Sequence, residues 1–323
     1  MLSAILSRIK ILKDFRRGNT GDAIFKTVAY LFGFLLLFIT GFIVYELWIQ
    51  SGLARREFGF SFLWSSAFNP SIEEFGALPF IFGTLVTAFI ALLIAGPIGI
   101  GIAAFLVEIA PARVNKIVGF VIETLAAVPS VVYGLWGIFV LAPFLRDYVA
   151  PPLTLLFGWV PFLGGPFRGY SVFTASLVLA IMILPTAAAI SRNVLRAVPN
   201  AQREGMLALG ATRWEMFSRA VMPYAKGGII GALTLALGRA AGETMAVTII
   251  IGNAPRIFGS LFEQGATMAS IIAANFANAG SAMFVSSLIL IGLILFLITF
   301  TINVVARILV KATSSGPSAT GGL

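Results

Sequence analysis

The sequence predicts an all-α integral membrane protein, a polytopic bundle of six transmembrane helices. Of its 323 residues, 59% are hydrophobic and only 11% are charged, whereas a soluble domain carries roughly 25% charged residues. The apolar residues gather in charge-poor stretches of about 20 residues, the length that crosses a bilayer. The net charge is +9, and its basic residues fall in the segments between those stretches. This placement favours a membrane-topology explanation over nucleic-acid binding.

Residues 1–26 are expected to form a basic cytoplasmic segment ahead of the permease domain, which spans residues 27–311. Leu2, Ile5 and Ile9 recur at helical spacing with Arg8 and Lys10 among them. This pattern favours an amphipathic helix on the inner membrane surface over a cleavable signal, whose charges precede a continuous apolar core. A disordered basic tail is the alternative. Residues 312–323 are rich in Gly, Ser, Thr and Ala and are predicted to be disordered.

The first three spans are read from apolar stretches. The first runs from Thr27 to Tyr45 and carries no charge. The second lies within Phe75–Val107, which exceeds one bilayer crossing and contains a helix-kinking Gly96-Pro97 pair. The third is predicted from about Thr124 to Leu145.

The last three spans follow the same rule. The fourth is predicted from about Tyr170 to Ser191, and the fifth from Lys226 to Ile251. The sixth ends near Arg307, inside a charge-free run from Gln264 to Ala306 that is too long for one helix. The stretch Thr267–Phe276 is therefore expected to form a short helix or re-entrant piece outside the main span.

Basic residues set the orientation. With the N-terminus in the cytoplasm, an even number of spans also places the C-terminus there. Most basic residues then lie inside, and those outside are Arg55, Arg56, Arg146, Arg168 and Arg256. Two outer segments, Gln50–Glu74 and Arg146–Arg168, exceed a simple turn. They could dock an external partner or serve as plain connectors.

The cytoplasmic loop of residues 192–225 carries helix stop and restart signals. Pro199 and Asn200 are helix-start residues, and a helix from Ala201 to Leu209 would end at the C-terminal cap Gly210.

A capping box then opens a second helix, because Glu215 follows Thr212 by three positions. This second helix is expected to stop before Pro223. The predicted result is a helix, a tight turn and a second helix, held against the inner membrane face.

This loop resembles the EAA loop of ABC-importer permeases, a pattern of Glu-Ala-Ala, three residues, Gly, nine residues and Ile-x-Leu-Pro. Glu204, Gly210 and Pro223 match it. Where the pattern has Ala, Ala, Ile and Leu, this chain has Gly205, Met206, Ala220 and Met222. The resemblance implies that the loop, including its Thr212–Glu215 box, docks in a groove of a separate ATPase subunit. An ordinary amphipathic connector is the alternative.

The residues themselves argue against an enzyme. The sequence has no Cys, no His, no G-x-x-x-x-G-K-[ST] phosphate loop and no evident nucleophile-and-base pair. A transport subunit that binds no cofactor is expected, with ATP and Mg used by the partner ATPase.

The fifth span carries two charges, Arg239 and Glu243, four positions apart. A charge near the bilayer centre costs at least about 3 kcal/mol on insertion scales, so lipid-facing positions are disfavoured. On a continuous helix the two residues share a face and can pair. Arg239 then either lines a translocation path and meets an anion, which suits its planar fork, or forms a permanent structural pair with Glu243.

Three stretches, Phe75–Thr84, Pro97–Pro111 and Gly238–Thr248, resemble the Pst-type phosphate importer permeases, in particular the PstC-like subunit. The resemblance extends from about residue 70 to 310. It implies the type I ABC-importer permease fold, the import of inorganic phosphate, and a substrate path that includes Arg239, Glu243 and Thr244.

The same resemblance implies a multi-pass protein of the cell inner or plasma membrane, in contact with lipid and with no nucleic acid. Its expected partners are a second, PstA-like permease, a pair of PstB-like ATPase subunits and an extracytoplasmic PstS-like phosphate-binding protein. An ABC importer for sulfate, molybdate or phosphonate is the nearest alternative, and a transporter or channel without an ATPase is the other.

Overall fold

A computed structural model describes residues 20–167 and 169–313, and most of them are helical. The predicted amphipathic segment before Thr20, Arg168 and the predicted tail after Thr313 lie outside the described residues. Within them, six helices are long and apolar enough to cross a membrane: Ile24–Gln50, Leu78–Ile109, Ser130–Phe157, Val172–Arg196, Arg213–Ala241 and Ala282–Lys311. The predicted all-α bundle is therefore confirmed.

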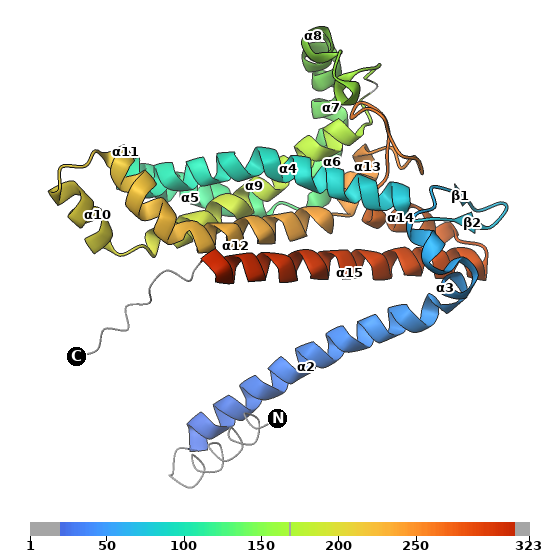
Figure 1. Cartoon of the computed structure of the whole chain (residues 1–323), viewed down its shortest axis with the longest axis horizontal. Coiled ribbons are helices and arrows are strands. Elements are labelled where there is room, and N and C mark those ends of the chain that lie inside the picture. The colour runs from blue at the N-terminus through green and yellow to red at the C-terminus, as the bar shows by residue number, and fades with distance from the viewer. Residues whose placement is uncertain (1–19, 168, 314–323) are drawn as a thin grey trace.

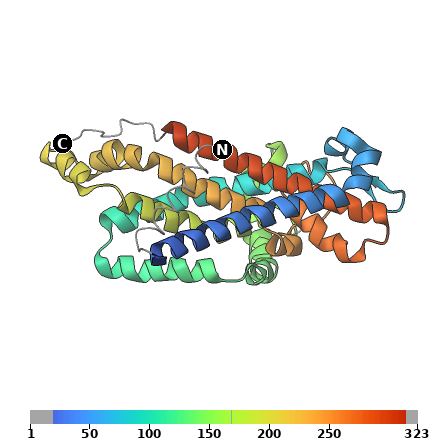
Figure 2. The ribbon, with the colours of Figure 1, turned by 90° about the horizontal axis from the view of Figure 1, so that it is seen from below.

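The core of the bundle consists of four long helices that lie side by side (Figures 1 and 2). They are α4 (Leu78–Ala104), α9 (Val172–Arg196), α12 (Met222–Ala241) and α15 (Ala282–Thr313). Small residues let α4 and α9 approach closely: a methyl group built on Gly99 would lie 3.0 Å from the Cβ of Ala187. Close backbone approach of this kind is typical of membrane helix packing.

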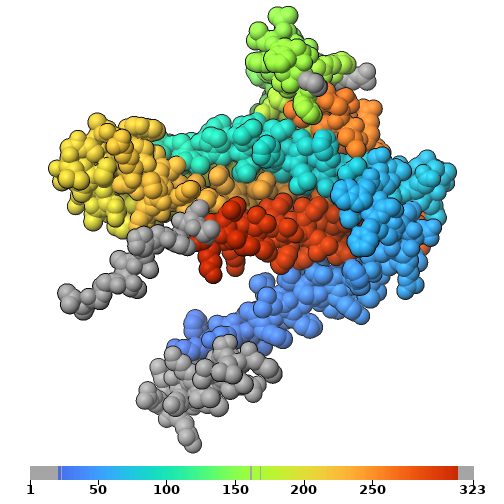
Figure 3. Space-filling model, viewed as in Figure 1, coloured from blue at the N-terminus to red at the C-terminus, as the bar shows by residue number. Residues whose placement is uncertain are grey.

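The first span, α2 (Thr20–Gln50), is an arm that diverges from this bundle (Figures 1 and 3). It begins and ends beyond the predicted Thr27–Tyr45 stretch. None of its most apolar window is buried, although its side chains are hydrophobic. Within the described residues the arm is therefore an uncovered apolar surface, open to lipid or to another subunit.

The predicted outer segment Gln50–Glu74 is folded. It contains α3 (Gly52–Phe58), a 3-10 turn (Gly59–Leu63) and a short antiparallel hairpin of β1 (Phe68–Asn69) and β2 (Glu74–Phe75). The ring of Phe68 packs edge-on against Phe75, Phe80 and Phe284, which join the hairpin to the ends of α4 and α15.

The second span begins within the predicted stretch Phe75–Val107 and ends two residues beyond it, at Ile109. The helix α4 continues into a π-helical turn, Phe105–Ile109, and includes Pro97. Pro79 lies in its first turn, where a proline sacrifices no helical hydrogen bond.

The predicted third span, Thr124–Leu145, is wrong in its boundaries, because the chain bends at Val128-Pro129. The helix α5 (Ala112–Ala127) runs along the bundle and ends before Val128, whose ψ of 129° is extended. A residue before proline avoids the α region, and proline lacks the N–H that would continue the helix.

A second helical rod then crosses the bundle direction (Figures 1 and 2). It consists of α6 (Ser130–Trp136), a π turn (Gly137–Leu141), α7 (Ala142–Phe144), a π turn (Leu145–Val149) and α8 (Ala150–Phe157). The first half of the predicted outer loop Arg146–Arg168 is therefore helical. A 3-10 turn, Pro161–Leu163, follows.

The short element expected before the last span is present. It is α14 (Met268–Asn275), followed by a 3-10 turn (Phe276–Asn278). Thr267 caps α14 by accepting the N–H of Ser270 at 3.1 Å. A cap of this kind supplies the local start signal that an apolar run by itself does not.

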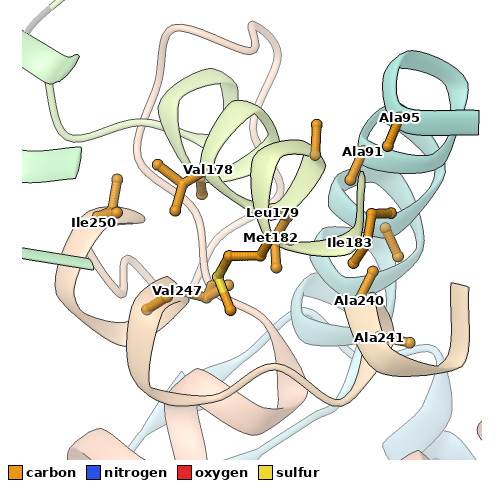
Figure 4. Packing of buried hydrophobic residues seen from close by; sticks show 14 of the residues in the cluster. Ala91, Ala95, Val178, Leu179, Met182, Ile183, Ala240, Ala241, Val247 and Ile250 are labelled. Atoms are coloured by element: carbon orange, nitrogen blue, oxygen red, sulfur yellow. The ribbon is translucent and has the colours of Figure 1, made fainter. Parts of the chain in front are cut away.

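The largest hydrophobic cluster lies where α4, α9 and the end of α12 meet (Figure 4). Ala91 and Ala95 of α4, Ile183 of α9 and Ala240 of α12 meet there. This packing places the last turn of α12 directly beside the middle of α9.

Candidate substrate path and inner coupling loop

The fifth span is interrupted at its two charged residues. The helix α12 ends at Ala241, and a second helix, α13 (Met245–Ile250), begins after Thr244. The Glu243 carboxylate accepts the N–H of Ala246 at 3.2 Å, so it satisfies a free donor in the first turn of α13. An acidic residue is favoured at a helix start.

The predicted pairing of Arg239 with Glu243 is therefore not formed. Among the ion pairs of residues 20–167 and 169–313, none joins the two side chains. Pairing at i and i+4 requires a continuous helix, and the helix ends two residues after Arg239.

Arg239 instead contacts the fourth span. Its Nη1 donates to the hydroxyl of Thr186 at 2.9 Å, and its side chain is exposed on the surface of the single chain. A neutral hydroxyl leaves the positive charge uncompensated, in a segment apolar enough to cross a membrane. Such a charge requires water, an anion or a neighbouring subunit.

Thr186 was not singled out from the sequence, where a lone threonine follows Pro185 in an apolar run. Hydroxyl residues are common in membrane helices, so the sequence offers no signal for this contact. Thr244, which was singled out, forms hydrogen bonds on both sides of the break between α12 and α13. Its hydroxyl donates to Gly242 O at 3.3 Å, and its carbonyl accepts the Thr248 hydroxyl at 2.6 Å.

The first part of the loop of residues 192–225 folds as its local signals predict. The helix α10 (Asn200–Ala208) is followed by Gly210 with a φ of +83°, a left-handed conformation that favours glycine. The capping box is complete: Thr212 N donates to Glu215 at 2.9 Å, and Glu215 N donates to the Thr212 hydroxyl at 3.3 Å.

The second loop helix does not stop before Pro223. The helix α11 (Arg213–Met216) continues through a π-helical turn (Phe217–Val221) directly into α12. In an α-helix the proline ring would clash with the carbonyl four residues earlier. The wider π turn immediately before Pro223 relieves this clash, so that loop and span form one continuous helical rod.

The outward face of this loop is uncovered. No residue of α10 is buried, and Glu204, Gly210, Thr212 and Pro223 are exposed whereas Glu215 is half-buried. The large side chains of Leu209 and Trp214 are 85% and 72% exposed. Trp214 also lines one groove with the exposed Leu207, and exposed apolar side chains grouped on one surface are typical of a protein–protein interface.

One strong contact of the loop was missed by the sequence analysis. Arg203, adjacent to Glu204, forms an ion pair of 3.0 Å with Glu108, which lies in the π turn that ends the second span. The two residues lie 95 positions apart, so no local pattern could bring them together.

The comparisons with known proteins agree with this architecture. Residues 95–315 match the family described as binding-protein-dependent transport system inner membrane component. The chain is 46% identical over 296 residues to the phosphate transport system permease protein PstC of Mesorhizobium japonicum, covering 90% of both chains. It is 44% identical to PstC of Pasteurella multocida, covering 90% of this chain and 91% of that one.

Two solved structures share the fold. One is a bacterial alginate ABC transporter with an alginate pentasaccharide-bound periplasmic protein, at a TM-score of 0.57 and 16% identity, covering 89% of this chain and 96% of that chain. The other is the MetNI methionine ABC transporter, at a TM-score of 0.53 and 18% identity, covering 72% and 93%. The chain thus belongs to the binding-protein-dependent transport system inner membrane components, and within them to the PstC phosphate transport permeases.

Proposed function

We propose that this chain is one of two membrane-spanning subunits of an ATP-driven importer of inorganic phosphate. The observation that carries the proposal is the exposed guanidinium of Arg239 in the fifth span, held by the neutral hydroxyl of Thr186. The identity of the anion as phosphate is inferred from the PstC relatives. Geometry alone would accommodate sulfate, molybdate or phosphonate equally well.

In this proposal Arg239 is the anion-binding group of the path. Its planar fork can donate two hydrogen bonds to a phosphate. The Thr186 hydroxyl holds only Nη1, and a doubly charged phosphate is a stronger acceptor. The Glu243 carboxylate accepts a hydrogen bond from α13. It therefore does not compete with phosphate for the guanidinium of Arg239.

The chain needs partners to work in this way. The uncovered arm α2 offers a surface to a second, PstA-like permease. The uncovered face of α10 and α11 offers one to a pair of PstB-like ATPase subunits, which would bind ATP and Mg. Enzymatic activity is thereby assigned to the ATPase and transport to this chain.

The far end of the bundle offers a surface for a PstS-like binding protein. There the segment after α8 is fastened to the loop after α13, because Leu261 N donates to Phe162 O at 2.9 Å and Phe173 N donates to Leu261 O at 2.8 Å. The ring of Phe262 packs edge-on against Phe167 and Phe173. Two segments far apart in sequence therefore present one ordered surface.

The test is phosphate uptake at micromolar supply by cells that lack this chain and by the same cells carrying it on a plasmid. We expect uptake to fall without the chain and to return with it. Unchanged phosphate uptake with a loss of sulfate, molybdate or phosphonate uptake would assign the chain to another oxyanion. Flux through the purified chain in vesicles without ATP would contradict an ATP-driven importer.

A further inference from the structure

Arg203 is the residue by which α10 is anchored to the bundle. Its Nε and Nη2 donate to Glu108 Oε1 at 3.1 and 3.0 Å, its Nη1 donates to Val198 O at 2.6 Å, and its Nη2 donates to Leu195 O at 2.8 Å. A guanidinium has five N–H groups in a rigid plane, so one side chain can hold several acceptors in a fixed arrangement.

Two of these acceptors belong to different spans. Glu108 lies in the π turn that ends the second span, and Leu195 belongs to the last turn of α9, the fourth span. Arg203 itself lies in α10. One side chain therefore joins α10 to the C-terminal ends of the second and fourth spans, which are separate in sequence.

The pair is shielded from water. The side chains of Arg203 and Glu108 are 15% and 12% exposed, and ion pairs in such surroundings are screened by salt much less than exposed ones. Because its donors are taken up by these acceptors, the Arg203 guanidinium is not free to bind phosphate or an ATPase. The adjacent Glu204 is exposed, so Arg203 faces the bundle whereas Glu204 faces away from it.

The packing around the pair is loose. A groove of about 610 Å³ opens beside it, lined by Gly101, Phe105, Glu108, Arg203, Trp214 and Phe217 among others. The α10 helix has no buried residue, and of its side chains only Met206 joins the hydrophobic cluster at this end of the bundle. Hydrophobic packing alone therefore holds α10 weakly.

We propose that the Arg203–Glu108 bridge transmits the movement of α10 to the second span. The fourth and fifth spans need no such contact, because only three residues separate α9 from α10 and α11 continues directly into α12. With the bridge intact, a displacement of the loop moves three spans as one unit. Without it, the same displacement moves the fourth and fifth spans and leaves the second span behind. Arg203 is thus a positioning residue, and this inference rests on the proposed function.

The test uses the complete transporter in proteoliposomes, with its ATPase and binding protein, and measures phosphate moved per ATP hydrolysed. Glu108→Gln keeps the size of the side chain and removes its charge. We expect the ratio to fall about tenfold while ATP hydrolysis continues, a loss within the usual span of coupling between sites. Arg113→Gln, on an exposed arginine in the first turn of α5 and outside the loop of residues 192–225, is the matched control and should keep the normal ratio.

The exchange of the two charges in Glu108→Arg with Arg203→Glu should restore part of the ratio, which a purely packing role would not. A normal ratio in Glu108→Gln would overturn the proposal. If Glu108→Gln fails to assemble, Arg203→Gln decides, because it removes the bridge from the other side by taking away the positive charge. A normal ratio in Arg203→Gln, or failure of this variant to assemble too, would overturn the proposal.

These outcomes are distinct from a failure of the proposed function. A wild-type transporter that moves no phosphate with ATP contradicts phosphate import, whatever the bridge does. A wild-type transporter that moves phosphate, with an unchanged ratio in the variants, contradicts only the bridge.

Discussion

At the scale of single residues, the candidate path depends on Arg239 and on the group that holds it. Its partner is the hydroxyl of Thr186, 53 positions away, and not the nearby Glu243. Within residues 20–167 and 169–313, no acidic side chain forms an ion pair with this charge in a membrane span. The chemistry therefore favours an anion as the transient partner over a permanent internal ion pair.

We expect Arg239→Gln to abolish phosphate uptake while the protein still inserts and assembles. Glutamine keeps a donor for Thr186 but removes the charge that attracts the anion. Thr186→Val should be milder, lowering uptake severalfold, because the guanidinium loses only its resting partner. Uptake in cells and recovery of the intact transporter by affinity purification measure the two effects separately. A loss of assembly in Arg239→Gln would instead indicate a structural role.

Gly210 is the second residue whose role can be tested by itself. With φ at +83°, a residue other than glycine or asparagine costs roughly 1–2 kcal/mol in this conformation. We expect Gly210→Val to distort the turn and lower the phosphate moved per ATP hydrolysed. Gly210→Asn is the control, since asparagine tolerates the left-handed region. Equal coupling in the two variants would count against a rigid turn.

At the scale of elements, three helix boundaries differ from what the sequence suggests. Proline has opposite consequences in two of them. Pro129 ends a helix and turns the chain across the bundle, whereas the helix passes through Pro223 because a π turn precedes it. The third, the break at Gly242–Thr244, is stabilised by the Glu243 carboxylate at the start of α13.

The arm α2 gives the element-scale prediction. Leu36 lies within it, 68% exposed, and an arginine at the centre of a span costs about 2.5–3.5 kcal/mol on insertion scales. We expect Leu36→Arg to lower the amount of assembled transporter in the membrane. Phe25→Arg, near the helix end where a long side chain can reach the interface, is the control. Equal levels of the two variants would show that the middle of α2 faces water.

At the scale of the whole molecule, the arrangement of the two ends supports the orientation predicted from the basic residues. The start of α2 and the end of α15 both point toward the end of the bundle that carries α10 and α11 (Figure 1). The hairpin β1–β2 lies at the opposite end. The described ends of the chain and the α10–α11 loop therefore lie toward the same end of the bundle, as that prediction requires.

The chain has no cysteine, so single cysteines can report this topology directly. We expect a membrane-impermeant maleimide to label Ser71→Cys, in the exposed hairpin, from outside intact cells. Gln202→Cys, in exposed α10, should react only after the membrane is opened. Labelling of Gln202→Cys from outside would place the coupling loop on the wrong side for an ATPase.

The sequence by itself determined the features that arise locally. Membrane spans follow from the length and composition of apolar runs, and the helix–turn–helix of the inner loop follows from Gly210 and the Thr212–Glu215 box, whose partners are at most three residues apart. The likeness of Gly238–Thr248 to phosphate permeases likewise required no coordinates.

Only the tertiary structure decided which distant groups meet and where helices break. Arg239 pairs with Thr186, and Arg203 pairs with Glu108, because neighbouring spans pack at particular positions along their lengths. The Arg239–Glu243 ion pair does not form, because the helix α12 ends between the two residues. Each outcome depends on competition between local hydrogen bonds and contacts with other helices, and spacing along the chain carries no information about those helices.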